Sequence, residues 1–259
     1  MSDPRGRHRG ATGAGPPVVD PSAHAEAITS SHVEVLNVAI EVDDRLVAPL
    51  LPAPLRLTLP PMVTFVIWRF HESSLGAFTL AQTRVTTRLK VRSRGLVLGS
   101  YFHGAPAAAE ELRTHWGFAC LPGDIRLVRH HDEIRGAVEA GGKVALEVVG
   151  RAPHAIGPDD LREMSSLNPV RAVTSEGEQA RLLQVDTEFR VEAASRSIQL
   201  EVQAFNGSAW NAPDIRQEYG VRALHYHCEM RLPPPRYLFD PMLTSEQESE
   251  QIERRLPVA

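Results

Sequence analysis

The sequence has little lysine, little cysteine and no long hydrophobic run. Of its 28 basic residues only Lys90 and Lys143 are lysines, so a mechanism that needs an amine nucleophile has two candidates. Cys120 and Cys228 are the only cysteines. Two are too few for a disulfide framework or a zinc knuckle, and we expect both thiols to be reduced. No apolar run approaches the roughly 20 residues that a membrane-spanning helix needs, so we expect no membrane partner.

The charge is low and follows no pattern. The formal net charge is −4, and the basic residues are scattered along the chain instead of forming one stripe. Nucleic-acid-binding surfaces concentrate their basic residues, so we expect no nucleic-acid partner. The first ten residues are basic and polar with no apolar segment behind them. This start indicates neither a secretory signal nor an anchor, and it favours a cytoplasmic location.

The residues that are present divide the chain into three parts. Residues 1–31 are rich in Gly, Pro, Ser and Ala without periodicity, a composition that predicts a disordered tail. From His32 onward, short runs of Val, Leu, Ile and Thr alternate with turn residues, as is typical of an antiparallel β protein. Residues 244–259 form a second polar tail. We therefore expect one β-dominated α+β domain over residues 32–243.

The apolar runs predict nine strands and two short helices. The expected strands are Val33–Val42, Met62–Phe70, Phe78–Arg92, Gly95–His103, Asp124–Arg129, Lys143–Gly150, Leu182–Ala193, Ile198–Ala204 and Val221–Leu232. The expected helices are Arg45–Leu51, which two prolines end, and Ala107–Trp116, which Pro106 begins. Hairpin turns are expected at residues 93–95 and 140–142, where glycine supplies the positive φ of a tight turn.

Several segments, in order along the chain, resemble acetoacetate decarboxylase and its superfamily. They are Leu51–Leu55 with its two prolines, the strand Val63–Arg69, the Gly76–Thr79 segment, the stretch from Tyr101 to the Glu111-Leu112 pair, Leu121-Pro122, Asn168–Arg171 and the strand ending at Pro233. The resemblance implies a closed antiparallel β barrel or cone with flanking strands and a few short helices. It also implies a homo-oligomer that binds a small organic molecule.

The chain departs from the family at the residues that carry its reaction. In the family, a buried lysine after the Glu-Leu helix forms a Schiff base with a β-keto acid. The two adjacent lysines of the family correspond here to Gly117 and Phe118, and the cavity glutamate corresponds to Leu80. The first-strand arginine has no counterpart in Val38–Val42. Lys90 and Lys143 lie next to expected turns and should face solvent, so a Schiff-base mechanism is not expected.

Polar side chains on the strands are the candidates for a catalytic role instead. Alternate residues of a strand face the same way, so Gln82 and Arg84 should share the face of Leu80. Arg69 ends the preceding strand and could bind a carboxylate or enolate with two N–H groups. Its alternative role is an ion pair with Glu41 or Asp43. His103 could act as a general acid or base, or could be an ordinary surface histidine.

The remaining candidates form the expected wall of the cavity. Substrate-binding roles are predicted for Leu80, Tyr101, His115, Trp116, Gly117 and Phe118. Large aromatic side chains in this set favour an apolar or mixed organic substrate over acetoacetate. Cys120 beside His115 could be a nucleophile, but its apolar neighbours favour a packing role.

Two histidines and a glutamate on the last expected strand are candidate metal ligands. His225, His227 and Glu229 should share one strand face, which makes metal binding conceivable. The residues that follow, Arg231 and Leu232, do not continue a metal-binding motif. The favoured interpretation is therefore a lining or packing role, with no metal and no cofactor.

These observations predict a divergent tailoring enzyme of secondary metabolism that acts without covalent attachment. A polyketide-like or β-dicarbonyl substrate would undergo cyclisation, dehydration, isomerisation or cycloaddition in the cavity. Two alternatives stay open. The chain could be a non-catalytic binding relative, or it could decarboxylate by a route that needs no lysine.

Overall fold

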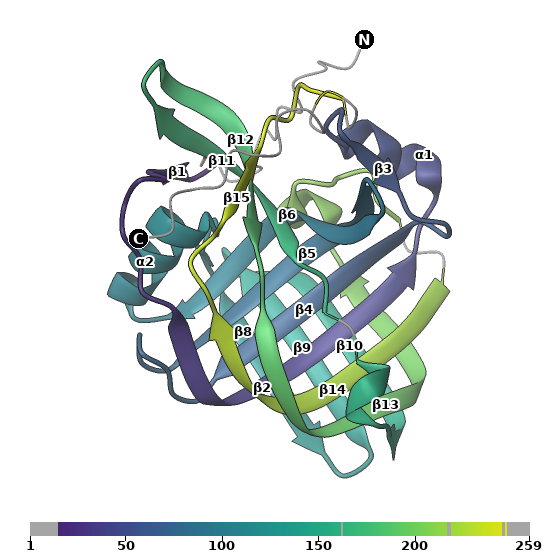
Figure 1. The fold of residues 1–259 in the computed structure, drawn as a ribbon. Helices are drawn as coiled ribbons and strands as arrows, with labels where there is room; N and C mark the ends of the chain where they lie inside the picture. Colours follow the sequence, from purple (N-terminus) through teal and green to yellow (C-terminus); the bar gives the residue numbers. More distant parts are fainter. Residues whose placement is uncertain (1–14, 162, 217–218, 245–246, 248–259) are drawn as a thin grey trace.

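In the computed structural model, the described residues are 15–161, 163–216, 219–244 and 247, and most of them lie in strands. Fifteen strands form one sheet (Figure 1). They are β1 (Val18–Val19), β2 (Ile28–Glu41), β3 (Leu55–Leu57), β4 (Met62–Phe70), β5 (Phe78–Leu89), β6 (Arg92–Gly104), β7 (Leu121–Pro122), β8 (Asp124–His130), β9 (Glu133–Ala140), β10 (Lys143–Ala155), β11 (Ser166–Thr174), β12 (Gly177–Val185), β13 (Glu188–Phe205), β14 (Tyr219–Leu232) and β15 (Tyr237–Phe239).

The centre of the sheet is antiparallel, in the order β6-β5-β4-β2-β14. Beyond β14 the long strand β13 leads to β10, β9 and β8, and the sheet curls so that these strands lie behind the centre (Figure 1). The β-dominated prediction is confirmed. The expectation of a closed barrel is not, because the pairing path of the described strands runs from β15 to β8 without joining its ends.

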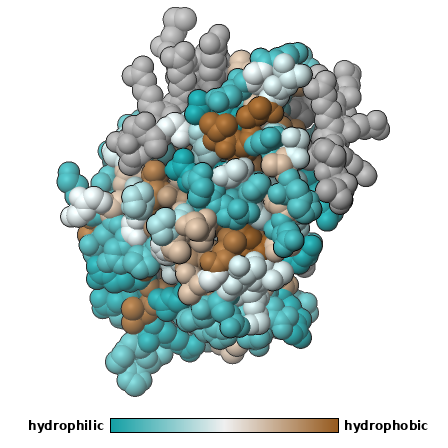
Figure 2. All heavy atoms as spheres, turned by 90° about the vertical axis from the view of Figure 1, so that its left-hand side faces the viewer, coloured by the Kyte–Doolittle hydropathy of each residue, from teal (hydrophilic) through white to brown (hydrophobic). Residues whose placement is uncertain are grey.

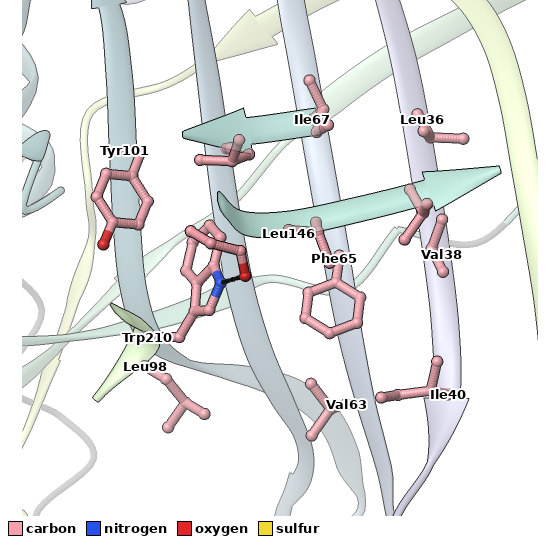
Figure 3. Packing of buried hydrophobic residues seen from close by; sticks show 14 of the residues in the cluster. Leu36, Val38, Ile40, Val63, Phe65, Ile67, Leu98, Tyr101, Leu146 and Trp210 are labelled. Atoms are coloured by element: carbon pink, nitrogen blue, oxygen red, sulfur yellow. Dashed lines mark hydrogen bonds between the residues drawn. The ribbon is translucent and has the colours of Figure 1, made fainter. Parts of the chain in front are cut away.

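One hydrophobic core fills the space between the central strands and the curled-back strands (Figure 3). Val63, Phe65 and Ile67 of β4 point into it, as do the alternate residues Leu36, Val38 and Ile40 of β2. Two buried polar groups in this core find backbone partners, since Trp210 Nε1 donates to the Ala145 carbonyl and the Tyr101 hydroxyl donates to that of Ala209. This face of the central strands is therefore largely packed for stability.

A second core covers the opposite face of the same central strands. Here lie Val66 and Trp68 of β4, Leu80 of β5 and Phe102 of β6, with Leu112 and Trp116 from helix α2 (Pro106–Trp116) packed against them. The chain after the 3-10 helix η2 (Pro158–Asp160) crosses in front of this face on its way to β11 (Figure 1). The central strands are thus buried on both sides, which explains their almost continuous hydrophobic runs.

Both predicted helices are present. The first is the short helix α1 (Asp44–Val47), where the Asp43 side chain caps the Arg45 N–H, followed by the 3-10 turn η1 (Ala48–Leu50). Helix α2 begins with Pro106 at its first turn and ends at Gly117, whose φ of +66° is the left-handed conformation of many helix ends. A third 3-10 turn, η3 (Gly207–Trp210), places Trp210 in the first core.

The turn at Gly141-Gly142 is confirmed, with φ of +56° and +73°. The turn expected at residues 93–95 is wrong, because β5 and β6 pair as far as Leu89 and Arg92 and the chain reverses at Lys90 and Val91. Lys90 takes the positive φ of +56° that was assigned to glycine. Lys90 and Lys143 are both exposed, as expected.

Other boundaries differ where strands continue through polar residues. The predicted strand Met62–Phe70 is confirmed residue for residue, whereas the predicted Leu182–Ala193 is divided into β12 and β13 at Asp186 and Thr187. Strands β9 and β11 were not predicted. Paired structure also starts before residue 32, since β1 pairs with β11 and β2 begins at Ile28. Residues 1–14 of the predicted disordered tail and most of the second polar tail lie outside the described residues.

The surface around α2 and β1 is mainly hydrophilic, with hydrophobic residues in small separate patches (Figure 2). Within the described residues, neither α-helix has the length and hydrophobicity that crossing a bilayer would require.

Candidate functional site

A buried polar cluster lies on the face of β5 that carries Leu80. Leu80 is fully buried in the second core, and Gln82 and Arg84 follow it on the same side of the strand with exposures of 1% and 2%. Arg84 Nε and Nη2 donate to Gln82 Oε1 at 2.9 and 2.7 Å. The guanidinium also lies 4.7 Å from the centre of the Trp68 ring. Burial lowers the pKa of Arg84, and the nearby Glu163 and Tyr226 oppose that shift.

The counter-charge of Arg84 comes from the segment after η2. Glu163 Oε2 lies 3.9 Å from Arg84 Nη1, and both side chains are at most 5% exposed. Glu163 Oε1 accepts hydrogen bonds from the Tyr226 hydroxyl and from Asn37 Nδ2, the latter at 3.3 Å. Burial, followed by the negative charge of Glu163, raises the pKa of Tyr226 well above its usual range. Four elements, β2, β5, β14 and the segment after η2, therefore meet at one charged group.

Several buried polar atoms of this face have no hydrogen-bond partner among the described residues. They are Asn37 Oδ1, Thr64 Oγ1, Trp68 Nε1 and Gln82 Nε2. Thr64 pairs with Arg84 across the strands, and Asn37 and Gln82 flank Val66 on either side. An unpaired buried polar group costs about 1–3 kcal/mol. The set contains two N–H donors, an amide oxygen and a hydroxyl, which together could bind an oxygenated organic molecule.

An apolar wall borders the polar cluster. Phe118 lies 6.5 Å from Trp68 between ring centres, and Phe78 stacks with Phe70 and Phe102 at 4.3 and 5.6 Å. Phe118 belongs to the same buried core as Leu80 and Trp116. Phe118 and Leu80, which the resemblance predicts to replace a lysine and a glutamate of the family, thus belong to one buried apolar core.

Gly117 fits its position for steric reasons. A Cβ atom there would lie 2.5 Å from Val170 Cγ1, and the positive φ adds strain for any other residue. Trp116 next to it is fully buried and donates Nε1–H to the Pro233 carbonyl at 3.1 Å. Asn168 Nδ2 in turn donates to the Trp116 carbonyl. These bonds hold the end of α2, and with it Phe118, against the sheet.

Three predicted site residues lie on the opposite face of the sheet. Arg69 and His103 both pair across the strands with Thr79 of β5. Thr79 is adjacent to Leu80 and points to the other side of the sheet, so Arg69 and His103 do not share the face of Leu80 and Gln82. Arg69 forms its ion pair with Glu34, at 3.0 Å, and not with Glu41 or Asp43. Tyr101 lies in the first core, and His103 is exposed. The structure therefore does not bring these residues together with Gln82 and Arg84.

His115 also lies apart from the cluster. It sits in the last turn of α2, 3.6 Å from Glu111, and lines a surface pocket with His24, Leu183 and Arg236. Cys120 is buried, and burial raises the pKa of its thiol to about 12. A thiol with so high a pKa is a poor nucleophile, which favours the packing role.

Sequence reasoning missed Asn37, Glu163 and Tyr226. Tyr226 carried a usable signal, because it alternates with His225 and His227 and so had to face the other side of β14. Glu163 carried none, since it lies outside regular structure and only the folded chain places it over β5.

The chain is similar to known proteins over most of its length. Residues 15–240 match the family model described as acetoacetate decarboxylase. A solved structure titled "Structural Studies of Acetoacetate Decarboxylase" has a TM-score of 0.72 and 18% identity, covering 85% of this chain and 92% of that one. The acetoacetate decarboxylase of Legionella pneumophila subsp. pneumophila str. Philadelphia 1 has a TM-score of 0.68 and 20% identity, covering 83% and 88%.

A more distant likeness is to the enduracididine biosynthesis enzyme MppR. Its complex with the condensation product of pyruvate and imidazole 4-carboxaldehyde has a TM-score of 0.67 and 12% identity, covering 85% of this chain and 92% of that one. No curated protein matches the sequence. Identities this low carry over the fold and not the reaction.

Proposed function

The chain belongs to the acetoacetate decarboxylase family, and we propose that it is an enzyme that activates a β-dicarbonyl or polyketide-like substrate without a Schiff base. The observation that carries the proposal is the buried Arg84–Gln82–Glu163–Tyr226 cluster beside apolar Leu80 and Phe118. Both lysines of the chain are exposed at hairpin turns. A cation, a carboxylate and a phenol in one site from which water is excluded can instead form an enolate and stabilise it by hydrogen bonding.

Each group in the cluster has a role in this reaction. The Glu163 carboxylate removes a proton from the carbon between two carbonyl groups, and the C–H electrons move to a carbonyl oxygen. Gln82 Nε2 and the free N–H groups of Arg84 donate hydrogen bonds to that oxygen. The Tyr226 hydroxyl, which is hydrogen-bonded to Glu163, can pass its proton to a departing hydroxyl group or to a new carbon position and take up the proton that Glu163 removed, so no buried phenolate is left. Dehydration, isomerisation and cyclisation all share this enolate.

The apolar wall favours substrates larger and less polar than acetoacetate. Phe118 and Trp68 offer aromatic surfaces next to the polar cluster. A conjugated or aromatic part of the substrate would lie against them while its oxygens meet Arg84 and Gln82. The family likeness to an enzyme of enduracididine biosynthesis supports a place in secondary metabolism.

Proton exchange tests the proposal directly. The wild type should accelerate deuterium incorporation at the α-carbon of ethyl acetoacetate, followed by NMR in D₂O. Glu163→Gln should reduce the enzyme-catalysed rate by about 100-fold or more, as loss of a general base does. Arg84→Met should reduce it by a similar factor because the enolate oxygen loses its cation. Arg69→Gln, on the opposite face, is the matched control and should keep the rate within about twofold.

The alternatives predict other outcomes. A binding protein would bind β-dicarbonyl compounds without accelerating exchange in any variant. A Schiff-base enzyme would be trapped by borohydride with acetoacetate on Lys90 or Lys143, and a lysine-independent decarboxylase would release carbon dioxide from acetoacetate. We expect neither an adduct nor carbon dioxide. Exchange that is lost in Arg69→Gln and kept in Glu163→Gln would place the site on the wrong face and overturn the proposal.

A further inference from the structure

A second cluster of ionisable side chains lies on the face of the sheet opposite Arg84. Glu34 of β2 pairs with His227 of β14 across the strands, and His225 is the next residue of β14 on the same side. His225 and Glu34 are buried, with exposures of 3% and 7%, and His227 is half-buried. None of the three takes part in the proposed enolate chemistry.

The ligand-type atoms of these residues converge. One ligand atom from each of Glu34, His225 and His227 lies within 4.8 Å of the other two. His225 Nε2 is 2.9 Å from Glu34 Oε1. Two imidazoles and one carboxylate are a ligand set for Zn²⁺ and for other first-row transition metals. Three protein ligands also leave a position for water or another group.

Further imidazoles lie close to the three residues. The His32 ring is 5.5 Å from the His227 ring and 4.7 Å from the His71 ring. His71 Nε2 lies 3.8 Å from Glu34 Oε2, and both His32 and His71 are exposed. The cluster is therefore open to solvent on the side of these two histidines, and either could supply a further ligand.

Arg69 affects the cluster in two ways. It binds Glu34 Oε2 at 3.0 Å and leaves Oε1 facing His225, which orients the carboxylate as outer-shell partners of metal ligands do. Its positive charge also opposes a bound cation. Removal of that charge should therefore tighten the binding of a metal ion.

A purely structural role explains only part of the arrangement. The His225–Glu34–Arg69 contacts could simply join β14, β2 and β4. His227 is not explained in this way, because its buried Nδ1 has no hydrogen-bond partner within the described residues.

We propose that Glu34, His225 and His227 form a binding site for one divalent first-row transition-metal ion, with Zn²⁺ as the ion of choice. The sequence pattern had offered Glu229 as the third ligand. An irregularity in the pairing between Cys228 and Met230 interrupts the alternation there, and Glu229 pairs with Arg190 instead. The strand pairing of β2 supplies Glu34 in its place.

Metal titration of the full chain tests the site. The protein, first treated with a chelator, should bind one equivalent of Zn²⁺ by calorimetry. Co²⁺ should give the visible absorption of an ion with histidine ligands, and Zn²⁺ should displace it. His227→Gln should weaken binding by about 100-fold or more, since even outer-shell losses cost 10–100-fold. Arg69→Gln removes the positive charge but keeps a side-chain N–H donor for Glu34 Oε2, so this variant should bind the metal ion more tightly than the wild type.

His130→Gln is the matched control. His130 and His131 form an exposed pair with ring centres 4.2 Å apart, so they are the competing place for adventitious binding. This variant should keep the affinity of the wild type. His225→Gln, checked by circular dichroism, repeats the test at a second ligand. The proposal is overturned if no stoichiometric binding occurs, or if His130→Gln removes it while His227→Gln does not. α-Proton exchange is measured separately, so either proposal can fail alone.

Discussion

The two faces of the central strands carry polar clusters of opposite character. On one face, Arg84 and Glu163 are 2% and 5% exposed and lie among tryptophan, phenylalanine and leucine side chains. On the other, Arg69 is 30% exposed, and Glu34 next to it is surrounded by histidines near the surface. The first arrangement excludes water from its charges, and the second admits it.

This difference bears on what each cluster can do. A buried charge pair costs desolvation energy that its attraction repays only in part, so the Arg84–Glu163 pair is weak evidence for a purely stabilising role. Strong hydrogen bonds in a dry place suit the stabilisation of an enolate. A buried site that the exposed His32 and His71 connect to solvent suits the exchange of an ion with water. One sheet can support both because successive residues of each strand point to opposite faces.

Removal of one charge from each cluster should give the largest difference in stability between the two faces. Glu163→Leu leaves the Arg84 cation buried without its carboxylate partner among the described residues, and we expect a loss of about 3–5 kcal/mol in the free energy of unfolding. Arg69→Gln should lose only about 1 kcal/mol, because Arg69 is 30% exposed and the buried Glu34 keeps its hydrogen bond with His225. Urea denaturation measures both.

The double variant Arg84→Met/Glu163→Leu is the control for this comparison. It should recover most of the stability that Glu163→Leu loses, because no charge is then left buried alone. Equal losses in Glu163→Leu and Arg69→Gln would show that the two clusters do not differ in solvation.

Alkaline pH should destabilise in particular the face of the sheet that carries Arg84, from which water is excluded. Burial raises the pKa of Cys120 and of Cys228 to about 12, against 9.0 for a free thiol. A folded-state pKa above the unfolded one means that the stabilisation is complete below pH 9 and is lost as the pH rises toward 12. At pH 10.5 the loss should be about 2 kcal/mol per thiol relative to pH 8.

Urea denaturation at pH 8, 9, 10 and 10.5 measures this slope. The variant Cys120→Ala/Cys228→Ala is less stable at every pH because it leaves small cavities, but its slope should be shallower than that of the wild type. An identical slope in the variant would assign the alkaline loss to other groups. In the native protein at pH 8, both thiols should also resist iodoacetamide.

Local patterns predicted one face of β5 and failed to predict how the strands combine. Alternation placed Leu80, Gln82 and Arg84 on one side, because the period of a strand is two residues whatever its neighbours do. The side on which Arg69 lies depends on the register between β4 and β5, which pairs it with Thr79. That register follows from a turn and a core that the strand pattern does not specify.

The same reason explains why the sequence did not predict the metal ligand Glu34 and the proposed base Glu163. Glu34 reaches His227 through pairing between strands almost two hundred positions apart in the chain, and Glu163 reaches Arg84 from a segment without regular structure. Neither contact has a local signal. The family resemblance pointed to Leu80 and Phe118, and the structure buries both in the second core. Their correspondence to the family's glutamate and lysine stays a prediction.

Substitution of one threonine on each face should give the smallest of the expected differences between the two faces. Thr64 lies next to Arg84, and Thr83 lies between Ala81 and Val85 of the first core. Both hydroxyls are buried without a partner among the described residues. Valine has nearly the same shape, so Thr64→Val and Thr83→Val should each stabilise the fold by about 1 kcal/mol. Only Thr64→Val should slow α-proton exchange, by a few-fold, because it removes a polar group from the substrate side. Equal effects of both on exchange would mean that the unpaired hydroxyl at 64 has no part in the site and is only a packing defect.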